Sequence, residues 1–413
     1  MTRDIENKAA PGIPYFTPFQ DPPAGTPHDA ASAPTLFQPL RIRGVELHNR
    51  WGVAPMCTYS AGQDGRLTDW HLVHLGQYAL HGAGLVIAEA TAVEPRGRIS
   101  PHDSGLWDDE QIAPLRRITD YIHGQGSHAA IQLAHGGRKA SSLPPWIRLP
   151  GSIVAPEHLG GWPDHVVGPS GLRFDEDHVV PHELTSAQIG DVVQKFRDAA
   201  ARAVKAGFDV IEVHGAHGYL ISSFLSPTSN KRNDEYGGSF ENRTRLLREV
   251  LTAIRGVIPA NMPLWLRISA TEWMDHSGEP SWDLQSSIRL ARQLPALGVD
   301  VLDVSSGGNS AAQKFTVSQT YQTDLAGEIR RSLHAEGIFN LLIATVGQVR
   351  DGRFAASLVQ TGGEEPQADL VLAGRQFLRE ADFVLSAAQE LDVPVQWPSQ
   401  YLRAAPKVNR PNL

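Results

Sequence analysis

Short apolar runs alternate with helix-like periods along the chain from Arg50 onward. Each run has the length and the aliphatic composition of a strand that is buried on both faces of a parallel sheet. The runs span residues 52–56, 84–93, 128–133, 209–213, 264–269, 299–304, 341–345 and 369–373. Eight strands alternating with helices predict an α/β protein with a closed (β/α)8 TIM barrel rather than a doubly wound sheet.

Two of the intervening segments carry clear helical signals. The first is expected to begin at Thr185, where Gln188 is placed for a capping box, and its apolar positions repeat at helical spacing. These positions are Ile189, Val192, Val193 and Phe196. The second is expected to begin after Ser239 and to continue through an apolar face made of Leu247, Val250, Leu251 and Ile254.

The pattern divides the chain into three parts. Residues 1–35 are an irregular arm with seven prolines, residues 36–390 are the barrel, and residues 391–413 are a C-terminal tail. A Pro-rich arm cannot build a core alone, so a disordered tail is an open alternative. Residues 138–182 form a long connection after the third strand, without a sustained period. A connection of this length is expected to lie over the barrel mouth, although an unrelated surface excursion also fits.

Composition removes several classes of function. The 413 residues include 37 basic and 45 acidic side chains, a formal charge of -8, and no basic block, which argues against nucleic acid as a partner. Cys57 is the only cysteine, so no intrachain disulfide, iron–sulfur cluster or Cys-rich zinc site is expected. A reducing, cytoplasmic setting agrees with this. Neither a secretory signal nor an apolar run of about 18 residues occurs, so no membrane partner is expected.

Two imidazoles and a phenol stand where the fourth predicted strand ends. His214, His217 and Tyr219 follow the apolar run 208–213. Active sites of α/β barrels lie at the carboxyl ends of the strands. Two neutral imidazoles can donate hydrogen bonds to one carbonyl oxygen, and a nearby phenol can deliver a proton. The trio therefore suggests a site that polarises and protonates a carbonyl compound.

Other strand ends bring polar groups and glycines to the same face. Loops after the seventh and eighth strands are the usual phosphate site of such barrels, because glycines let backbone N–H groups approach an anion. Gly347, Gly374 and Arg375 occupy these loops, and Arg267 ends the fifth strand, where it could stabilise negative charge on a reduced flavin. Singly, each is more often a turn residue or an ion-pair partner; their convergence favours a phosphate-bearing ligand.

Four motifs resemble those of the old yellow enzymes, in order and with barrel spacing over roughly residues 36–403. They are Pro55-Met56-Cys57-Thr58-Tyr59-Ser60, residues 131–139 (IQLAHGGRK), residues 214–220 (HGAHGYL) and residues 230–243 (NKRNDEYGGSFENR). The cysteine in the first motif resembles the thermophilic-like branch of that family. The arm and the connection 138–182 are longer than is usual for compact members, which leaves the shape of the substrate pocket open.

The resemblance implies an FMN-dependent NADPH (or NADH) dehydrogenase that acts as an ene-reductase on enones and enals. The flavin would pass a hydride to the β-carbon, Tyr219 would protonate the α-carbon, and His214 and His217 would bind the carbonyl oxygen beside Tyr59. The residues implied around the flavin ring are Ala54, Pro55, Met56, Cys57, Ala90, Gln132 and Arg267. Gly347, Gly374 and Arg375 are implied at its phosphate.

Two further roles follow from the same resemblance. Cys57 would lie near the flavin and adjust its potential, whereas a small buried apolar side chain is the plain alternative. Residues 400–403 (QYLR) resemble a segment that projects an arginine, here Arg403, into the neighbouring subunit's active site. This implies a homodimer or a dimer of dimers, and a solvated tail is the alternative.

Competing functions remain open at this point. His214 and His217 could ligate a metal in a barrel hydrolase, but no His-Glu-x-x-His motif accompanies them, so no metal is expected. A sugar-phosphate aldolase or isomerase would need a Schiff-base lysine or a paired glutamate base, which the strand ends do not offer convincingly. A flavin-holding redox sensor would not need the proton donor Tyr219. A dienoyl-CoA reductase relative would carry a Cys-ligated cluster, for which this chain lacks the cysteines.

Overall fold

Eight parallel strands form a closed barrel at the centre of the computed structural model, which describes residues 7–147, 149, 152–362 and 365–407. The predicted TIM barrel is confirmed, with each predicted strand in place and its ends shifted by at most three residues. In barrel order the strands are β3 (Trp51–Val53), β4 (Leu85–Ala92), β5 (His128–Ala134), β8 (Val210–Gly215), β9 (Leu264–Ser269), β10 (Val301–Ser305), β11 (Leu342–Val346) and β12 (Leu370–Ala373).

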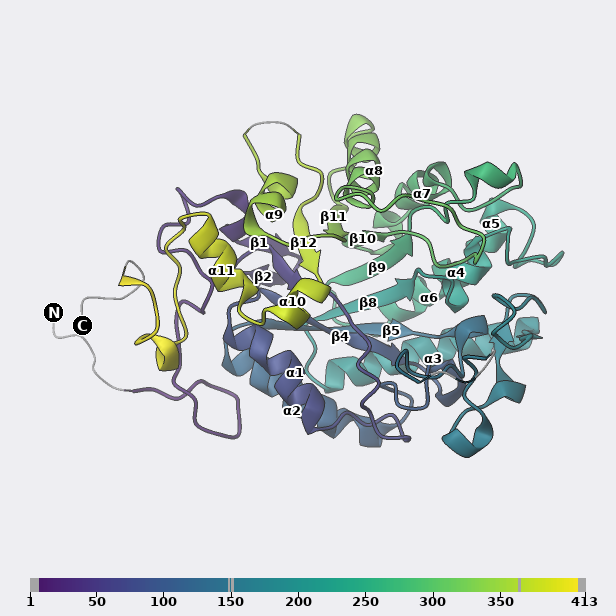
Figure 1. Ribbon diagram of the computed structural model, residues 1–413, viewed down its shortest axis with the longest axis horizontal. Helices are drawn as coiled ribbons and strands as arrows, with labels where there is room; N and C mark the ends of the chain where they lie inside the picture. The colour runs from purple at the N-terminus through teal and green to yellow at the C-terminus, as the bar shows by residue number, and fades with distance from the viewer. Residues whose placement is uncertain (1–6, 148, 150–151, 363–364, 408–413) are drawn as a thin grey trace.

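Helices surround the barrel, above and below the strands in Figure 1. In chain order they are α1 (Asp69–Leu80), α2 (Ile112–Gly124), α3 (Ser186–Lys205), α4 (Leu220–Leu225), α5 (Phe240–Arg243), α6 (Arg245–Arg255), α7 (Leu284–Ala291), α8 (Thr323–Ala335), α9 (Gly352–Val359), α10 (Arg375–Arg379) and α11 (Phe383–Glu390). Short 3-10 turns are η1 (Thr35–Phe37), η2 (Pro95–Gly97), η3 (Asp109–Gln111), η4 (Gly137–Lys139), η5 (Glu157–Leu159), η6 (Pro163–His165), η7 (Asp275–Ser277), η8 (Pro295–Leu297) and η9 (Ser399–Tyr401).

The two predicted helix starts are correct, but the second helix is not continuous. Thr185 and Gln188 form the predicted capping box of α3. Ser239 caps α5, which ends after one turn, and α6 begins two residues later. Between them Thr244 donates its hydroxyl to the carbonyl of Phe240 at 2.9 Å. A threonine that bonds back to the preceding turn competes with the helix and bends it, and the apolar pattern does not report this.

Alternate residues of each strand face the inside of the barrel. Val210, Trp265 and Val301 belong to an interior apolar cluster, which the hairpin of β1 (Leu40–Ile42) and β2 (Val45–Leu47) closes at the amino-terminal end of the strands. Their neighbours Ile211 and Leu302 face outward and join the larger core between strands and helices. Because side chains alternate with period two, the inward positions nearer the carboxyl ends are Glu212, His214, Arg267, Asp303 and Ser305. The polar layer therefore lies above the apolar one, toward the mouth.

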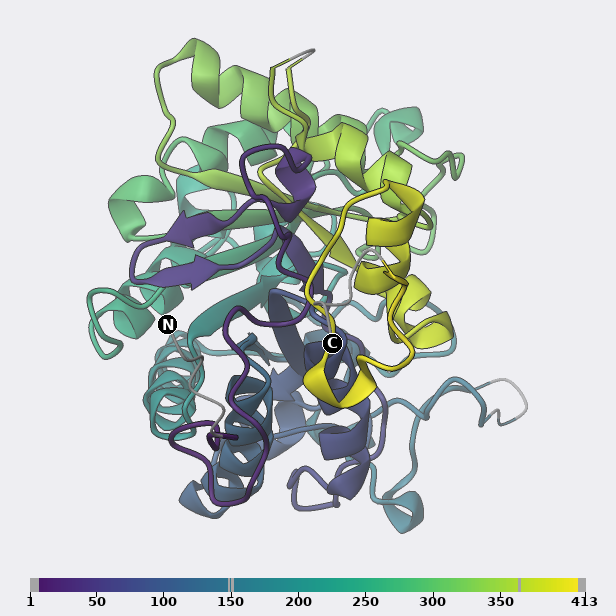
Figure 2. The same ribbon diagram turned by 90° about the vertical axis from the view of Figure 1, so that its left-hand side faces the viewer.

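The N-terminal arm and the C-terminal segment lie together at one end of the molecule (Figures 1 and 2). The backbone N–H of Gly25 donates to the carbonyl of Gln396 at 2.9 Å, and Pro27 bridges to Val395. The side chain of Asn49, just before β3, donates to the carbonyl of Gly25 at 3.2 Å. Through these contacts the described part of the predicted irregular arm packs on the amino-terminal end of the barrel, away from the mouth.

Described residues of the long connection after β5 lie near the mouth in more than one place, among them Phe174, whose ring faces the Lys139 ammonium. Pro145 lines the mouth cavity, and the ring of Trp146 packs edge-on against Tyr59 with centroids 5.4 Å apart. Farther along, β6 (Val167–Gly168) pairs with β7 (His182–Glu183). The indole N–H of Trp162 donates to the carbonyl of Arg96 in η2, so this ring packs beside the carboxyl end of β4. The described residues thus place parts of the connection beside the mouth, and its role as a cover stays a prediction.

Candidate active site

A cavity of about 690 Å³ opens at the carboxyl ends of the barrel strands. Its walls come from the ends of β3, β9, β10, β11 and β12 and from the loops that follow them. Ten of the residues predicted from the sequence line it: Ala54, Pro55, Met56, Cys57, Tyr59, His217, Arg267, Gly347, Gly374 and Arg375. The cavity is where the fold is expected to hold its ligand.

One end of the cavity suits an anion. Gly347 has a φ of +116°, and a Cβ added there would come within 2.6 Å of the side-chain amide nitrogen of Gln322. Only glycine therefore permits this backbone path beside the cavity. The guanidinium-bearing residues Arg350, Arg375 and Arg379 line the same region. Three guanidinium groups beside an accessible glycine backbone can bind a phosphate group. The sequence predicted this phosphate site from Gly347, Gly374 and Arg375 alone.

The opposite wall suits a flavin ring. Ala54, Pro55 and Met56 continue β3 into the cavity and supply an apolar surface, with Cys57 next to them. Arg267 is 6% exposed and lines the cavity from below. The Nε atom of Arg267 lies 3.1 Å from Oδ2 of Asp303, which leaves the terminal nitrogens of the guanidinium for a ligand in the cavity. A buried guanidinium with unused donor capacity fits the polar edge of a flavin, so the residues present are compatible with FMN.

His214, His217 and Tyr219 meet as predicted. The rings of His214 and His217 lie 5.1 Å apart, centroid to centroid, and Tyr219 packs edge-on against His214 at 4.9 Å. His217 lines the cavity, whereas His214 and Tyr219 lie behind it. The backbone of His217 is in the left-handed region at a φ of 62°. Such strain persists only where neighbours hold the residue, and it is common at functional sites.

Two side chains hold His217 in this conformation. The hydroxyl of Ser269 accepts from its backbone N–H at 2.9 Å, and the Lys139 ammonium donates to its carbonyl at 2.9 Å. Lys139 also donates to the carbonyl of Gly308 at 2.7 Å and stands over the rings of Phe174 and Tyr219. Burial, with the charge of Arg138 adding, lowers the pKa of Lys139 to about 8. In the sequence Lys139 is only part of a family motif, and its contact with the carbonyl of His217 could not be predicted from it.

Both imidazoles are neutral at neutral pH. Burial, helped by the positive charge of Arg267, holds the pKa of His214 and of His217 well below the usual value. The backbone N–H of Ala216 donates to Nδ1 of His214 at 3.2 Å, which leaves the proton of that ring on Nε2. Nε2 of His217 lies 2.7 Å from the hydroxyl of Ser305. When Ser305 donates to it, the ring proton of His217 lies on Nδ1.

The phenols of the site are also uncharged. Burial raises the pKa of Tyr219 well above the usual value, and Cys57 and Tyr59 add to the shift. Burial likewise raises the pKa of Cys57, with the charges of Asp103 and Glu89 adding. Tyr219 therefore carries its proton throughout the physiological range, and Cys57 is a neutral thiol rather than a thiolate.

Besides His214 and Tyr219, three further predicted residues do not line the cavity. Ala90 is buried within β4, and Gln132 is buried below the cavity, where its amide donates to Glu212 at 2.7 Å. Arg403 follows η9, whose Tyr401 packs on His81 at the end of α1. Because α1 runs back from the mouth to the start of β4, this places the tail at the opposite end of the barrel. Arg403 does not line the cavity of its own chain.

Some cavity residues carried no recognisable signal in the sequence. Tyr321, Gln322 and Arg350 line the cavity from loops, and Arg379 lines it from the end of α10. The Gln322 amide donates to the carbonyl of Val346 at 2.6 Å and accepts from the Ser306 hydroxyl at 2.9 Å, which ties the loop before α8 to the end of β11. The long polar loop between β10 and α8 is the sequence feature that could have indicated Tyr321 and Gln322 as candidate site residues.

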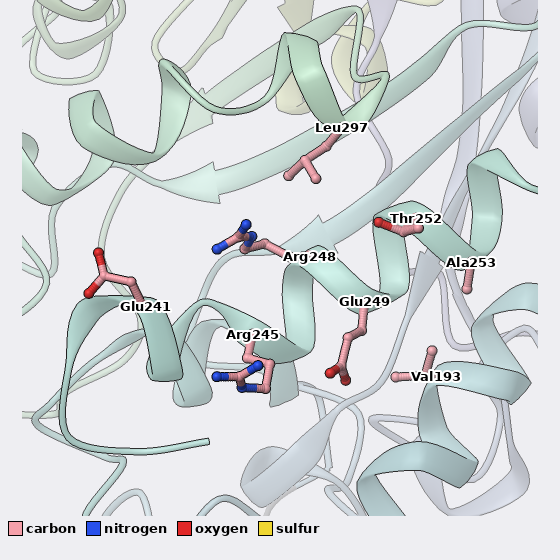
Figure 3. A pocket seen from close by; sticks show the side chains of 8 residues that line it. All are labelled: Val193, Glu241, Arg245, Arg248, Glu249, Thr252, Ala253 and Leu297. Atoms are coloured by element: carbon pink, nitrogen blue, oxygen red, sulfur yellow. The ribbon is translucent and has the colours of Figure 1, made fainter. Parts of the chain in front are cut away.

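A second hollow of about 520 Å³ lies on the outside of the barrel against α6 (Figure 3). Arg245, Arg248 and Glu249 project around it from α6, and Val193 of α3 also lines it. The Tyr236 hydroxyl donates to Glu249 at 3.1 Å. None of the predicted site residues lines this hollow, and it is open to solvent.

The described residues hold neither a membrane-spanning helix nor a cluster of metal ligands. Within the ranges that the structure describes, no helix is long and apolar enough to cross a membrane. No group of three or more His, Cys, Asp or Glu side chains is arranged there to hold a metal ion.

The barrel and its site define a flavin-dependent oxidoreductase, and comparison with known proteins gives the family. The model of the NADH:flavin oxidoreductase / NADH oxidase family matches residues 35–393, so the chain belongs to that family. An NADH:flavin oxidoreductase of Gibberella zeae is 44% identical over 405 residues, covering 96% of this chain and 95% of that protein. The NADPH dehydrogenase of Bacillus subtilis is 40% identical over 369 residues, covering 89% and 98%.

The solved structures agree. Morphinone reductase is 26% identical and superposes with a TM-score of 0.68 over 92% of this chain and 94% of its own. The predicted resemblance to the old yellow enzymes, the oxidoreductase class and the cofactors are confirmed: the protein uses FMN and a nicotinamide nucleotide.

Proposed function

We propose that the protein uses NAD(P)H to reduce the carbon–carbon double bond of α,β-unsaturated carbonyl compounds. The observation that carries this proposal is the meeting of two neutral imidazoles and one protonated phenol beside the cavity that suits FMN. Polarising a carbonyl and protonating the carbon next to it require this set of groups. The relatives named NADPH dehydrogenase and morphinone reductase support the same class of reaction.

We assign the flavin contacts to the residues named from the sequence. Ala54, Pro55, Met56, Cys57 and Arg267 would hold the ring, and Gly347, Gly374 and Arg375 the phosphate, with Arg350 and Arg379 nearby. Gln132 would act from below the cavity. When bound, FMN supplies the hydride that it takes from the nicotinamide. The lining of the cavity supplies the orientation and excludes water from one face.

His214 and His217 bind and polarise the substrate in this proposal. Nε2–H of His214 and Nδ1–H of His217 donate to the carbonyl oxygen, which gains negative charge as the enolate develops. Hydrogen bonds that strengthen in the transition state raise the rate rather than only the affinity. Removing one donor of this kind typically costs about 10²–10³ in rate. Tyr59, on the cavity wall, would contact the rest of the substrate.

Tyr219 supplies the proton to the α-carbon. Its ring packs edge-on against His214, so its position is fixed relative to the imidazole that binds the oxygen. Because its pKa is raised well above the usual value, the phenol stays protonated until the enolate, a stronger base, forms beside it. The Lys139 ammonium, 5.6 Å from the ring centroid, favours the charge left on the phenolate.

We also propose that the working unit is a dimer in which Arg403 enters the partner subunit's site. The tail that carries Arg403 lies at the far end of its own barrel, so any contact of this residue with a substrate must involve another chain. Gel filtration of the wild-type protein and of Arg403→Ala, with the KM for the enone measured on both, tests this. A fully active monomer would refute it.

An anaerobic titration tests the central proposal. The purified holoprotein is bleached with NADPH, and cyclohexenone is then added while the flavin absorbance is followed. We expect the colour to return with one equivalent of saturated ketone formed. Bleaching without recovery would keep the flavin but reject the enone. The double variant His214→Ala/His217→Ala is the matched control and should bleach normally but recover very slowly.

A further inference from the structure

Four polar side chains are buried together inside the barrel, directly below the cavity. Gln132 on β5, Glu212 on β8, Arg267 on β9 and Asp303 on β10 come from four strands that are consecutive in the barrel (Figure 1). Gln132 and Glu212 are paired in strand register, as are Arg267 and Asp303. Glu212 and Asp303 are fully buried, and only Arg267 reaches the cavity. The roles assigned above to Gln132 and Arg267 do not explain the two acids.

The contacts in this cluster leave carboxylate oxygens unsatisfied. Gln132 donates to Oε1 of Glu212 at 2.7 Å, and Nε of Arg267 lies 3.1 Å from Oδ2 of Asp303. Within the described residues, Oε2 of Glu212 and both oxygens of Asp303 have no hydrogen-bond donor. The two carboxyl groups are nevertheless within hydrogen-bonding reach of each other. Two carboxylates cannot form that bond, whereas a carboxylic acid and a carboxylate can.

The balance of charge in the cluster also indicates that one of the two acids is protonated. Two ionised acids beside one guanidinium would leave a net negative charge in a fully buried place, and buried charges persist only when they are paired. The only ionised partner in the cluster is Arg267, since the nearby His214 and His217 are neutral. One proton on the acid pair makes the cluster electrically neutral and supplies the missing donor.

We infer that Glu212 and Asp303 share one proton, with Glu212 as the acid that donates to Asp303 and Asp303 as the counter-charge that positions Arg267 under the flavin. Burial and the neighbouring Asp303 raise the pKa of Glu212 to about 8, which agrees with a proton held at neutral pH. The two acids are positioning residues. They determine the place of the Arg267 guanidinium and how much of its positive charge acts on the ring. This inference rests on the proposed position of the flavin against Arg267.

Two amide variants separate the roles of the acids. In Glu212→Gln the new amide can still accept from Gln132 and donate to Asp303, so it reproduces the protonated acid. In Asp303→Asn the ion pair of Arg267 is lost. Glu212 can then ionise, but it forms no ion pair with Arg267 among the described residues, so it compensates the guanidinium less well and more positive charge acts on the flavin. We expect Asp303→Asn to raise the equilibrium constant for flavin reduction about tenfold, which is about 30 mV for a two-electron couple, and Glu212→Gln to change it less than about twofold.

The shared proton can be observed directly by infrared spectroscopy of the wild-type holoprotein at pH 7. Solvated carboxyl groups are ionised there, so the C=O stretching band of a protonated carboxyl reports buried acids. Asp103 is another buried acid, whose pKa burial raises only to about 6, so it is mostly ionised at pH 7. We expect the band in the wild-type protein and its loss in Glu212→Gln.

The outcomes are distinguishable. Absence of the band from the wild-type protein, or its survival in Glu212→Gln, would refute the shared proton. Equal shifts of the potential in both variants would refute the division of roles. If Asp303→Asn does not fold, the infrared comparison still decides the proton. If the flavin ring does not lie against Arg267, neither variant shifts the potential, while the infrared band still tests the pair.

Discussion

Replacing Tyr219 with phenylalanine isolates the proton donor of the proposed reaction. The substitution keeps the ring that packs edge-on against His214 at 4.9 Å and below the Lys139 ammonium at 5.6 Å, and removes only the hydroxyl. Substrate binding through His214 and His217 should therefore survive. The chemical step that loses its donor is protonation of the α-carbon.

The size of the effect follows from the surroundings. A positioned general acid contributes about 10²–10⁴ in rate. Tyr59 is a second phenol on the cavity wall, and the cavity is open enough to admit water, so a slower source of protons remains. We therefore expect a loss near the lower end, about 10², which corresponds to about 3 kcal/mol of transition-state stabilisation.

Stopped-flow absorbance of the flavin measures the two half-reactions separately. Reduction by NADPH needs no proton from Tyr219 and should keep its wild-type rate, whereas reoxidation by cyclohexenone should slow about 10²-fold. Tyr236→Phe is the matched control, because that hydroxyl bonds to Glu249 outside the barrel and should affect neither step. Equal losses in both half-reactions, or none in reoxidation, would refute the assignment of Tyr219.

Three further changes test other parts of the structure. Gly347→Ala should weaken FMN binding about 10- to 100-fold, since the φ of +116° and the close Gln322 amide would cost about 1–3 kcal/mol. Fluorescence titration of the apoprotein with FMN measures the affinity, and an unchanged affinity would mean that the phosphate binds elsewhere. Cys57 should react slowly with iodoacetamide at pH 8 in the native protein, because burial raises the pKa of its thiol, and labelling as fast as in the denatured chain would contradict that. Glu94→Gln should destabilise the fold by about 3 kcal/mol at pH 7 in urea unfolding. Although burial opposes ionisation of Glu94, the hydrogen bond from His135 and the charges of Lys195 and Arg96 hold its pKa below the usual value. The stabilisation by the Glu94 carboxylate is therefore present above pH 4.5 and is lost as the pH falls below that. The difference in unfolding free energy between variant and wild type should shrink in acid, and a difference that grew there would contradict this reasoning.

Much of the fold could be predicted because its information is local. A strand buried on both faces needs an unbroken apolar run, and eight such runs separated by helical periods allow few arrangements other than a closed barrel. The helix start at Thr185 was equally readable, since a capping box involves residues three apart. The break in the helix at Thr244 could not be predicted from the sequence. A threonine hydroxyl can bond either to a carbonyl of its own helix or to another group, and tertiary packing determines which bond forms.

The candidate site divides in the same way. His214, His217 and Tyr219 lie within six residues at the end of β8, so the sequence alone brought them together and predicted their chemistry. Only the tertiary structure placed Lys139 on the carbonyl of His217 and Gln322 against β11, since the partners in each pair are far apart along the chain. The inferred pairing of Glu212 with Asp303 also depends on the structure, because the charges of these residues look ordinary in the sequence. The local sequence specifies the type of a side chain and its neighbours along the chain. Whether a group keeps its proton depends on its burial and on its partner across the barrel, and both arise only when the strands assemble into the closed barrel.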